Sequence, residues 1–208
     1  MLYEACIENL SDLNEVISRG AKRIELCDNL AVGGTTVSHG VMKYALSIAH
    51  ERQVSVATII RPRGGDFVYN DIEINAMEDD IFQAQQLGAD AVVFGTLTAE
   101  GKIDYPTMEQ LIAAASGMEC VMHMAFDHIA GDKIAAITEL KELGIDRILT
   151  HGGLTSTKIE DNLSQIQSYI LAANGEIQIL PGGGITTLNR DLVAEKTNAN
   201  QLHGTKIV

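Results

Sequence analysis

The stretch Gly20–Cys27, GAKRIELC, contains the pattern that decides the fold. A glycine closes a helical segment, a short turn follows, and an apolar strand then ends in a polar side chain. The same order recurs at Gly88–Gly95 (GADAVVFG) and at Gly144–His151 (GIDRILTH). Because one joint between helix and strand is repeated, we predict a chain built of βα units with parallel strands.

Eight segments have the length and apolar character of buried parallel strands. They are Leu2–Cys6, Arg23–Cys27, Val54–Ile60, Ala91–Gly95, Cys120–Met124, Arg147–Thr150, Ile177–Leu180 and Gln201–His203. Apolar residues recur with helical spacing between them. Eight parallel strands with helical crossovers predict an α/β fold, the (β/α)₈ TIM barrel, as a single domain over residues 1–208.

Two features qualify this prediction. A doubly wound open sheet is the alternative, but the count of eight strands and the lack of an early G-x-G-x-x-G motif disfavour it. The sequence reaches Val208 just past the eighth expected strand, without a further helical pattern. We therefore expect the eighth helix to be short or missing, with either another closure of the barrel or a shortened chain.

The charge and cysteine content exclude several classes of protein. With 15 Lys and Arg against 28 Asp and Glu, the net charge is −13, which argues against nucleic acid or an anionic membrane as a partner. No apolar run is long enough to span a bilayer, and the segment Met1–Cys6 lacks the pattern of a signal peptide. The three cysteines are scattered, so we expect free thiols in a reducing cytoplasm.

A charged loop follows the third expected strand. The strand Val54–Ile60 runs directly into Arg61–Phe67, RPRGGDF. Arginines at the end of a buried strand are costly unless an anion or a carboxylate meets them, and parallel α/β folds bind ligands at the carboxyl ends of strands. We therefore expect Arg61, Arg63 and Asp66 to belong to a site for an anionic ligand.

An E-x-C pattern ends the first two expected strands. Residues i and i+2 of a strand point to the same side, so Glu4 pairs with Cys6 and Glu25 with Cys27. We expect all four in the barrel mouth, with the two carboxylates near Arg61. The glutamates then either form a salt-bridge network or take part in substrate binding and acid–base catalysis.

Histidines end three later strands. His123 and Asp127 are candidate catalytic residues that could orient one another, and His151 and His203 are candidate ligand-binding residues. The alternative for a histidine at a strand end is a hydrogen-bonded core residue.

The seventh expected strand runs into three glycines. Gly182, Gly183 and Gly184 permit close approach of backbone N–H groups to an anion, as in the phosphate sites of many barrels. A tight βα turn is the alternative role for this loop.

Cys6 and Cys27 raise the question of a metal. They end neighbouring strands, and two thiolates suit a soft ion such as Cu(I). The chain has no C-x-x-C motif and no zinc-type spacing, and buried free cysteines are common. Cys120 lies on the opposite face of its strand and is expected to be structural.

Together these motifs resemble the CutC family of copper homeostasis proteins over nearly the whole chain. The resemblance rests on the two E-x-C ends, Gly33–Thr35, Ser38, Gly40, Ile60–Phe67, Met77, Asp80–Ile81, His123, Ala125–Asp127, Arg147–Thr150 and Gly182–Gly184. It implies a cytoplasmic TIM barrel that binds copper, with Cys6 and Cys27 as the Cu(I) ligands. The chain departs from the family pattern at Val37, where proline is usual, at Met124, where arginine is usual, and at His151, where serine is usual.

Two functions remain open at this point. The resemblance implies a copper-binding homeostasis protein with Cu(I) as the ion. The alternative is an enzyme that acts on a small phosphorylated or carboxylated metabolite at the C-terminal face of the barrel. The residues alone do not decide whether the protein is an enzyme, and exposed barrel helices make a homodimer one expected assembly.

Overall fold

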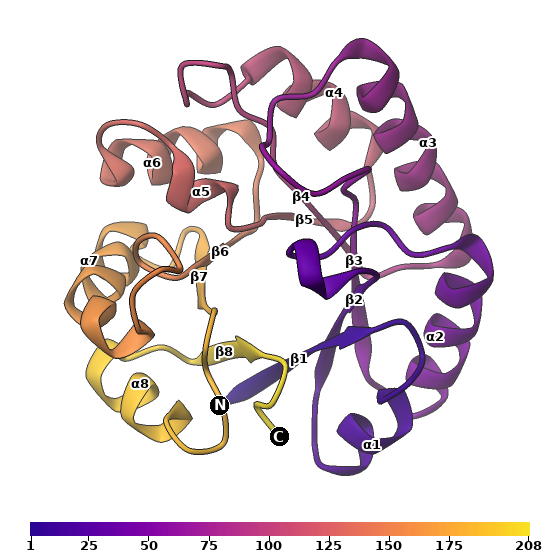
Figure 1. Ribbon diagram of the computed structural model, residues 1–208, viewed down its shortest axis with the longest axis horizontal. Helices are drawn as coiled ribbons and strands as arrows, with labels where there is room; N and C mark the ends of the chain where they lie inside the picture. The colour runs from indigo at the N-terminus through magenta and orange to yellow at the C-terminus, as the bar shows by residue number, and fades with distance from the viewer.

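Eight parallel strands form a ring surrounded by helices in the computed structural model, which describes residues 1–208 (Figure 1). The strands are β1 (Leu2–Glu8), β2 (Arg23–Cys27), β3 (Ser55–Ile59), β4 (Ala91–Phe94), β5 (Glu119–Met122), β6 (Arg147–Thr150), β7 (Gln178–Pro181) and β8 (Gln201–Gly204). The helices are α1 (Leu13–Ser18), α2 (His39–Glu51), α3 (Asp71–Leu87), α4 (Tyr105–Ala114), α5 (Ala125–His128), α6 (Lys133–Leu143), α7 (Leu163–Ala173) and α8 (Arg190–Thr197), with short 3-10 turns at Leu30–Val32 and Ile159–Asn162. The predicted single-domain (β/α)₈ barrel is confirmed.

The barrel has one seam. Hydrogen-bonded strands follow the order β7-β6-β5-β4-β3-β2-β1-β8, so β7 and β8 do not pair directly. Segments just beyond these two strands close the gap, because Thr186 bridges Lys206 and the N–H of Thr187 donates to the Lys206 carbonyl at 2.9 Å. Ile207 is fully buried in this closure. No helix follows β8, as the sequence predicted, and the last residues of the chain cover the seam instead.

The helix ends explain why the repeated glycines mark the joints. Helix α3 begins with a capping box between Asn70 and Glu73, and it ends at Gly88 with a φ of 82°. Helix α6 ends in the same way at Gly144, with a φ of 98°. These left-handed conformations favour glycine, so the glycine stops each helix and turns the chain into the next strand.

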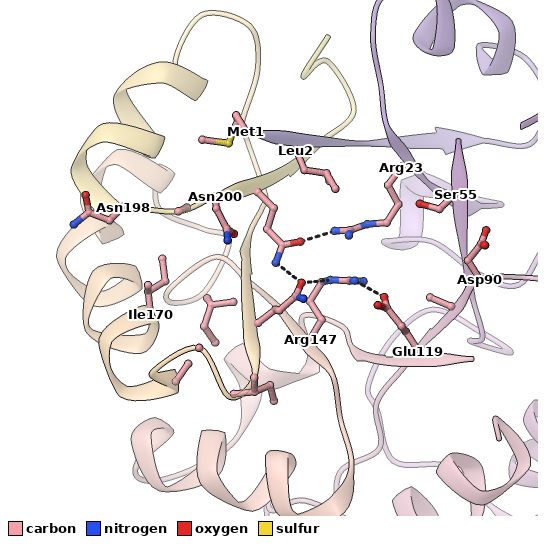
Figure 2. A pocket seen from close by; sticks show the side chains of 18 of the residues that line it. Met1, Leu2, Arg23, Ser55, Asp90, Glu119, Arg147, Ile170, Asn198 and Asn200 are labelled. Carbon is pink, nitrogen blue, oxygen red and sulfur yellow. Dashed lines mark hydrogen bonds and ion pairs between the residues drawn. The ribbon is translucent and has the colours of Figure 1, made fainter. Parts of the chain in front are cut away.

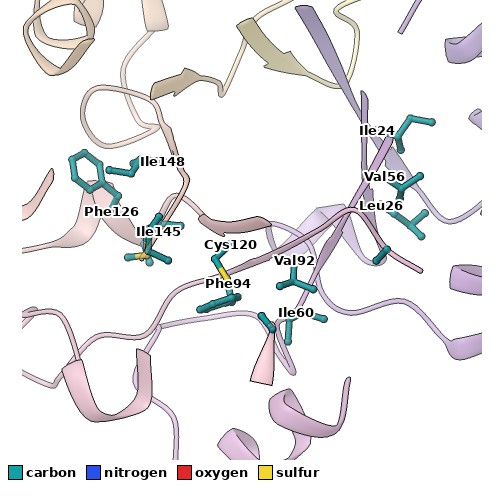
Figure 3. Close-up of a cluster of buried hydrophobic side chains, with 14 of the residues drawn as sticks. Ile24, Leu26, Val56, Ile60, Val92, Phe94, Cys120, Phe126, Ile145 and Ile148 are labelled. Carbon is teal, nitrogen blue, oxygen red and sulfur yellow. The ribbon is translucent and has the colours of Figure 1, made fainter. Parts of the chain in front are cut away.

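The strands separate two packed layers. Their outward side chains join the helices in the main hydrophobic core, where Ile24, Val92 and Phe94 lie (Figure 3). Their inward side chains form a smaller cluster inside the barrel, made of Cys6, Cys27, Ala57, Ile59, Ala91, Val93 and Val121. Cys120 belongs to the outer layer, as expected, while Cys6 and Cys27 face the barrel interior.

Several strand ends differ from the prediction. Strand β1 continues to Glu8 because its ladder with β2 extends until Glu8 faces Cys27. Strand β5 stops at Met122, so His123 lies just beyond the strand rather than within it. None of the helices combines the length and apolar character needed to cross a membrane.

Candidate functional site

A cavity of about 750 Å³ opens at the carboxyl ends of the strands. Residues from opposite sides of the ring line it, including Cys6, Glu25, Arg61, Asp66, Phe67, His123, Met124, Leu149, Gly183, Gly184, His203 and Thr205. Its size falls within the range of about 300–1,000 Å³ found for small-molecule sites. The candidate site therefore lies where parallel barrels place their chemistry.

Cys6 and Cys27 are brought together in the barrel, with their Sγ atoms 3.8 Å apart. Cys6 is opposite Glu25 in the ladder and Cys27 is opposite Glu8, so the two cysteines occupy diagonal positions. Strand spacing and rise place such Cα atoms roughly 8 Å apart, beyond the ~4.4–6.8 Å that a disulfide requires. Both cysteines are free, and the arrangement favours a bridging atom over an S–S bond.

Glu25 lies against the thiol pair. The Cys27 thiol donates to its Oε2 at 3.4 Å, and donor atoms of Cys6, Glu25 and Cys27 all lie within 4.8 Å of one another. Burial raises the pKa of Glu25 to about 8, although His203 opposes the shift. The hydrogen bond between the thiols lowers the pKa of Cys6 to about 5 against the effect of burial. The same bond, with burial, raises the pKa of Cys27 well above its usual value.

Glu4 lies deeper in the barrel, between two cations. It forms a buried ion pair with Nε of Arg23 and accepts from Nδ1 of His203 at 2.7 Å. Burial would raise the pKa of Glu4, but His203 and Arg23 hold it at about 2. Burial would likewise lower the pKa of His203, whereas Glu25 and Glu4 raise it well above its usual value. Of the two interpretations of the glutamates, Glu4 thus forms a salt-bridge network and does not line the cavity.

The predicted contact of Arg61 with the glutamates is wrong. Its guanidinium donates to the carbonyl oxygens of Val32, Gly34 and Gly65, at 2.9 to 3.0 Å. Arg23 takes the expected place beside Glu4, because it precedes Glu25 by two residues on β2 and faces the same interior. Arg61 instead holds two loops over the cavity, and its Nε remains buried without a partner.

Arg63 and Asp66 have separated roles. Nε of Arg63 contacts Glu73 at 2.5 Å, and its Nη1 contacts Asp66 at 3.0 Å. These contacts with carboxylates occupy the guanidinium, and Arg63 does not line the cavity. Asp66 does line the cavity, at its exposed rim. The structure therefore brings Arg61 and Asp66 to the mouth and leaves Arg63 in the loop behind it.

His123 lines the cavity and carries a buried hydrogen-bond donor. Its Nδ1 accepts from the backbone N–H of Ala125 at 3.2 Å, which leaves the proton on Nε2. Nε2 is buried and has no partner. Burial and the charge of Arg61 lower the pKa of His123 to about 3, so the ring is neutral at physiological pH. Gly95 makes room for it, since a Cβ there would lie 2.9 Å from the imidazole.

Asp127 and His151 form a separate structural unit. Asp127 accepts from the hydroxyl of Thr150 at 2.5 Å and from the N–H of His151 at 2.8 Å. The His151 ring contacts the carbonyl oxygens of Gly183 and Thr157 at 2.9 and 3.1 Å. Neither residue lines the cavity. The sequence predicts that Asp127 orients His123, but Asp127 bonds to Thr150 and His151 instead. This pair holds the end of β6 to the loop after β7.

The three glycines after β7 differ from one another. The N–H of Gly182 donates to the carbonyl of Thr150 at 2.9 Å, so it is not free for a ligand. Gly182 is needed for space, because a Cβ would lie 2.6 Å from Leu149 and 3.0 Å from His203. Gly183 and Gly184 line the cavity, and their N–H groups have no protein acceptor.

Sequence reasoning missed one contributor to the site, Phe67, and the buried partner of Glu4, Arg23, at the opposite end of the barrel. Arg23 was assigned only as the start of a strand, although its spacing from Glu25 placed it on the same face. Phe67 packs against His123 with ring centroids 4.9 Å apart, and it lies 5.0 Å from the Arg61 guanidinium. No periodic signal marks Phe67, because it lies in an irregular loop.

The comparisons with known proteins agree with one another. A model of the CutC family matches residues 1–208. A family protein CutC of Streptococcus pyogenes serotype M6 is 48% identical over 209 residues and is covered, like this chain, over 100% of its length. A human relative described as a copper homeostasis protein cutC homolog is 40% identical, with 97% of this chain and 72% of the human chain covered. The crystal structure of CutC from Streptococcus agalactiae matches with a TM-score of 0.97 and 46% identity over 100% of both chains.

Proposed function

The chain belongs to the CutC family, and we propose that it binds one Cu(I) ion between Cys6 and Cys27. The observation that carries this proposal is the pair of buried thiols with Sγ atoms 3.8 Å apart. Thiolates are the side chains that soft cuprous ions prefer. The names of the relatives, which refer to copper homeostasis, support the same ion.

The separation of the sulfurs suits a bent site. For metal–sulfur bonds of about 2.3 Å, the length in zinc sites, a 3.8 Å separation corresponds to an S–metal–S angle of roughly 110°. That angle leaves room for a third donor. The carboxyl of Glu25 is the nearest candidate, since its Oε2 lies 3.4 Å from Sγ of Cys27.

The protonation states also fit a monovalent cation. The lowered pKa of Cys6 makes its sulfur a thiolate at neutral pH, while Cys27 keeps its proton. Binding of Cu(I) to both sulfurs displaces the Cys27 proton, because the metal ligand is the thiolate. Because Cu(I) and the displaced Cys27 proton each carry one positive charge, the net charge of the buried cluster does not change. We place this exchange in the cytoplasm, where three unpaired cysteines remain reduced.

The enzyme alternative receives less support from the site. Arg63, Asp127 and His151, which were expected to serve an anionic substrate, lie outside the cavity. The cavity retains Glu25, His123 and Arg61, but Arg61 is engaged with backbone carbonyls. We therefore assign binding of copper rather than a reaction to the thiol pair.

A competition titration with a Cu(I) chelator tests the proposal. Reduced wild-type protein should take up one Cu(I), and the Cys6→Ala/Cys27→Ala double variant should bind it at least 1,000-fold more weakly, or roughly 4 kcal/mol. Cys120→Ala is the matched control, because this thiol is buried in the outer layer of the barrel wall. Equal affinities of the wild type and the double variant would contradict the proposal.

A further inference from the structure

We propose that the cavity at the barrel mouth binds a small phosphate monoester that also carries a carbonyl group, as a ligand independent of copper. The phosphate would accept from the N–H groups of Gly183, Gly184 and Thr205. The carbonyl oxygen would accept from Nε2–H of His123.

The phosphate end rests on free backbone donors from two neighbouring loops. Gly183 and Gly184 follow β7, and Thr205 follows β8. All three residues line the cavity, and none of their N–H groups donates to a protein acceptor. Grouped backbone N–H donors favour anions, and the loops after strands seven and eight are where barrels commonly hold phosphate.

The carbonyl end rests on His123. This side chain is only 4% exposed, and its Nε2 has no partner. The Ala125 N–H holds Nδ1 as the acceptor, so Nε2–H is a buried donor without a partner on a side chain that lines the cavity. A neutral imidazole that donates a hydrogen bond can polarise a carbonyl oxygen, as in other barrel enzymes. A buried donor without a partner costs free energy, which a ligand acceptor would recover.

The remaining lining is compatible with such a ligand. Phe67 packs against the His123 ring and, with Met124 and Leu149, gives the cavity an apolar wall. The Asp66 carboxylate is paired with Arg63 at the rim. The cavity volume of about 750 Å³ accommodates a ligand of metabolite size.

Three probes separate the two ends of the site. Dihydroxyacetone phosphate carries both groups, glycerol 3-phosphate lacks the carbonyl, and dihydroxyacetone lacks the phosphate. By calorimetry, we expect the first to bind about tenfold or more tightly than either of the others. In ¹H–¹⁵N spectra, both phosphorylated probes should shift the amide signals of Gly183, Gly184 and Thr205. Absence of binding at millimolar concentration, or shifts confined to other amides, would overturn the proposal.

Two variants of His123 form a matched pair. His123→Asn keeps an acceptor near the position of Nδ1 and loses the donor at Nε2, whereas His123→Gln keeps a donor near Nε2 and loses the acceptor. We expect His123→Asn to bind dihydroxyacetone phosphate about tenfold more weakly, with the affinity for glycerol 3-phosphate unchanged. His123→Gln should stay within about threefold of the wild type for both. Equal loss of both ligands in the folded His123→Asn variant would overturn the role of His123.

The copper site serves as an independent control. The Cys27→Ser variant removes one proposed Cu(I) ligand that does not line the cavity, and it leaves His123 and the three amides in place. We expect its affinity for dihydroxyacetone phosphate to stay within twofold of the wild type. Loss of this affinity together with copper binding would contradict the proposal that the two ligands bind independently. Loss of copper binding alone would support that independence.

Discussion

Charged side chains lie at both ends of the barrel interior, but their hydrogen bonds and ion pairs differ between the two ends. At the amino ends of the strands, Arg23 donates to Gln201, and Arg147 contacts Gln178 and pairs with Glu119 (Figure 2). Arg23 also pairs with Glu4. Nη1 of Arg147 is fully buried and has no partner. At the carboxyl ends, His123 and Arg61 each keep an unpartnered nitrogen, and Cys6, Cys27 and Glu25 have shifted pKa values.

The pairing of the buried charged side chains, rather than the volume of the cavity, distinguishes the structural network from the candidate functional site. The cavity at the amino ends is the larger, at about 1060 Å³ against about 750 Å³ at the mouth. Its arginines are engaged with carboxylates and amides, which is what a stable barrel requires of buried charge. The mouth has two buried nitrogens without a partner, on His123 and Arg61, and the shifted pKa values of Cys6, Glu25 and Cys27, features that are frequent in binding and catalytic sites.

The largest expected effect concerns the amino end. Arg23→Met removes one of the two cationic partners of the buried Glu4 carboxylate and the donor to Oε1 of Gln201, so we expect a loss of about 3–5 kcal/mol in the free energy of unfolding. Urea denaturation measures this loss. Arg19→Met is the control, because Arg19 pairs with Glu15 on the surface, with 60% of its side chain exposed, and should change stability by less than about 0.5 kcal/mol. Similar small losses in both variants would mean that the buried network is not structural.

The second effect concerns the mouth and depends on pH. The pKa of Glu25 is about 8 in the folded protein, against 4.5 for a glutamate in the unfolded chain. The folded state therefore binds the proton more tightly. This residue therefore lowers stability as pH rises from 4.5 to 8. Glu25→Gln removes the cost, and we expect its stability relative to the wild type to increase by on the order of 2–4 kcal/mol between pH 5 and pH 9. Parallel stability curves of the two proteins would contradict the shifted pKa.

The third effect concerns the proton of Cys27. Cys6 is a thiolate above its pKa of about 5, while Cys27 remains protonated at neutral pH. We expect the Cu(I) affinity to rise about tenfold per pH unit between roughly pH 6 and 8, or about 1.4 kcal/mol, as one proton is released. Chelator competition across this range measures the slope. An affinity that does not change with pH would show that Cys27 contributes no displaced proton.

The smallest effect concerns the loop behind the mouth. Arg63 is 37% exposed, and its ion pairs with Glu73 and Asp66 lie partly in solvent. We expect Arg63→Met to lower the free energy of unfolding by less than about 1 kcal/mol and to leave the affinity for dihydroxyacetone phosphate unchanged. A tenfold loss of that affinity would show that Arg63 takes part in ligand binding, although it does not line the cavity.

Most of the fold could be predicted because it depends on local periodicity. The glycines that end α3 and α6 mark the joints, and alternation along β1 and β2 placed Cys6 with Glu4 and Cys27 with Glu25 inside the barrel. These features need no knowledge of distant contacts.

The partners across strands could not be predicted in this way. Glu4 lies opposite Arg23 on one side and His203 on the other because of the register of β1 with β2 and β8. The spacing of residues along one strand does not contain this register. The contacts of Arg61 with loop carbonyls, and of Asp127 with Thr150, likewise depend on how loops fold over the mouth.

The most direct test of the central claim is the environment of the copper ion itself. X-ray absorption of reduced, Cu(I)-loaded protein reports the atoms bound to the metal. We predict two sulfur neighbours in the wild type and in Cys120→Ala, and the loss of both in Cys6→Ala/Cys27→Ala. A first shell of only nitrogen and oxygen atoms, or a spectrum that is unchanged in the double variant, would contradict the proposed copper site.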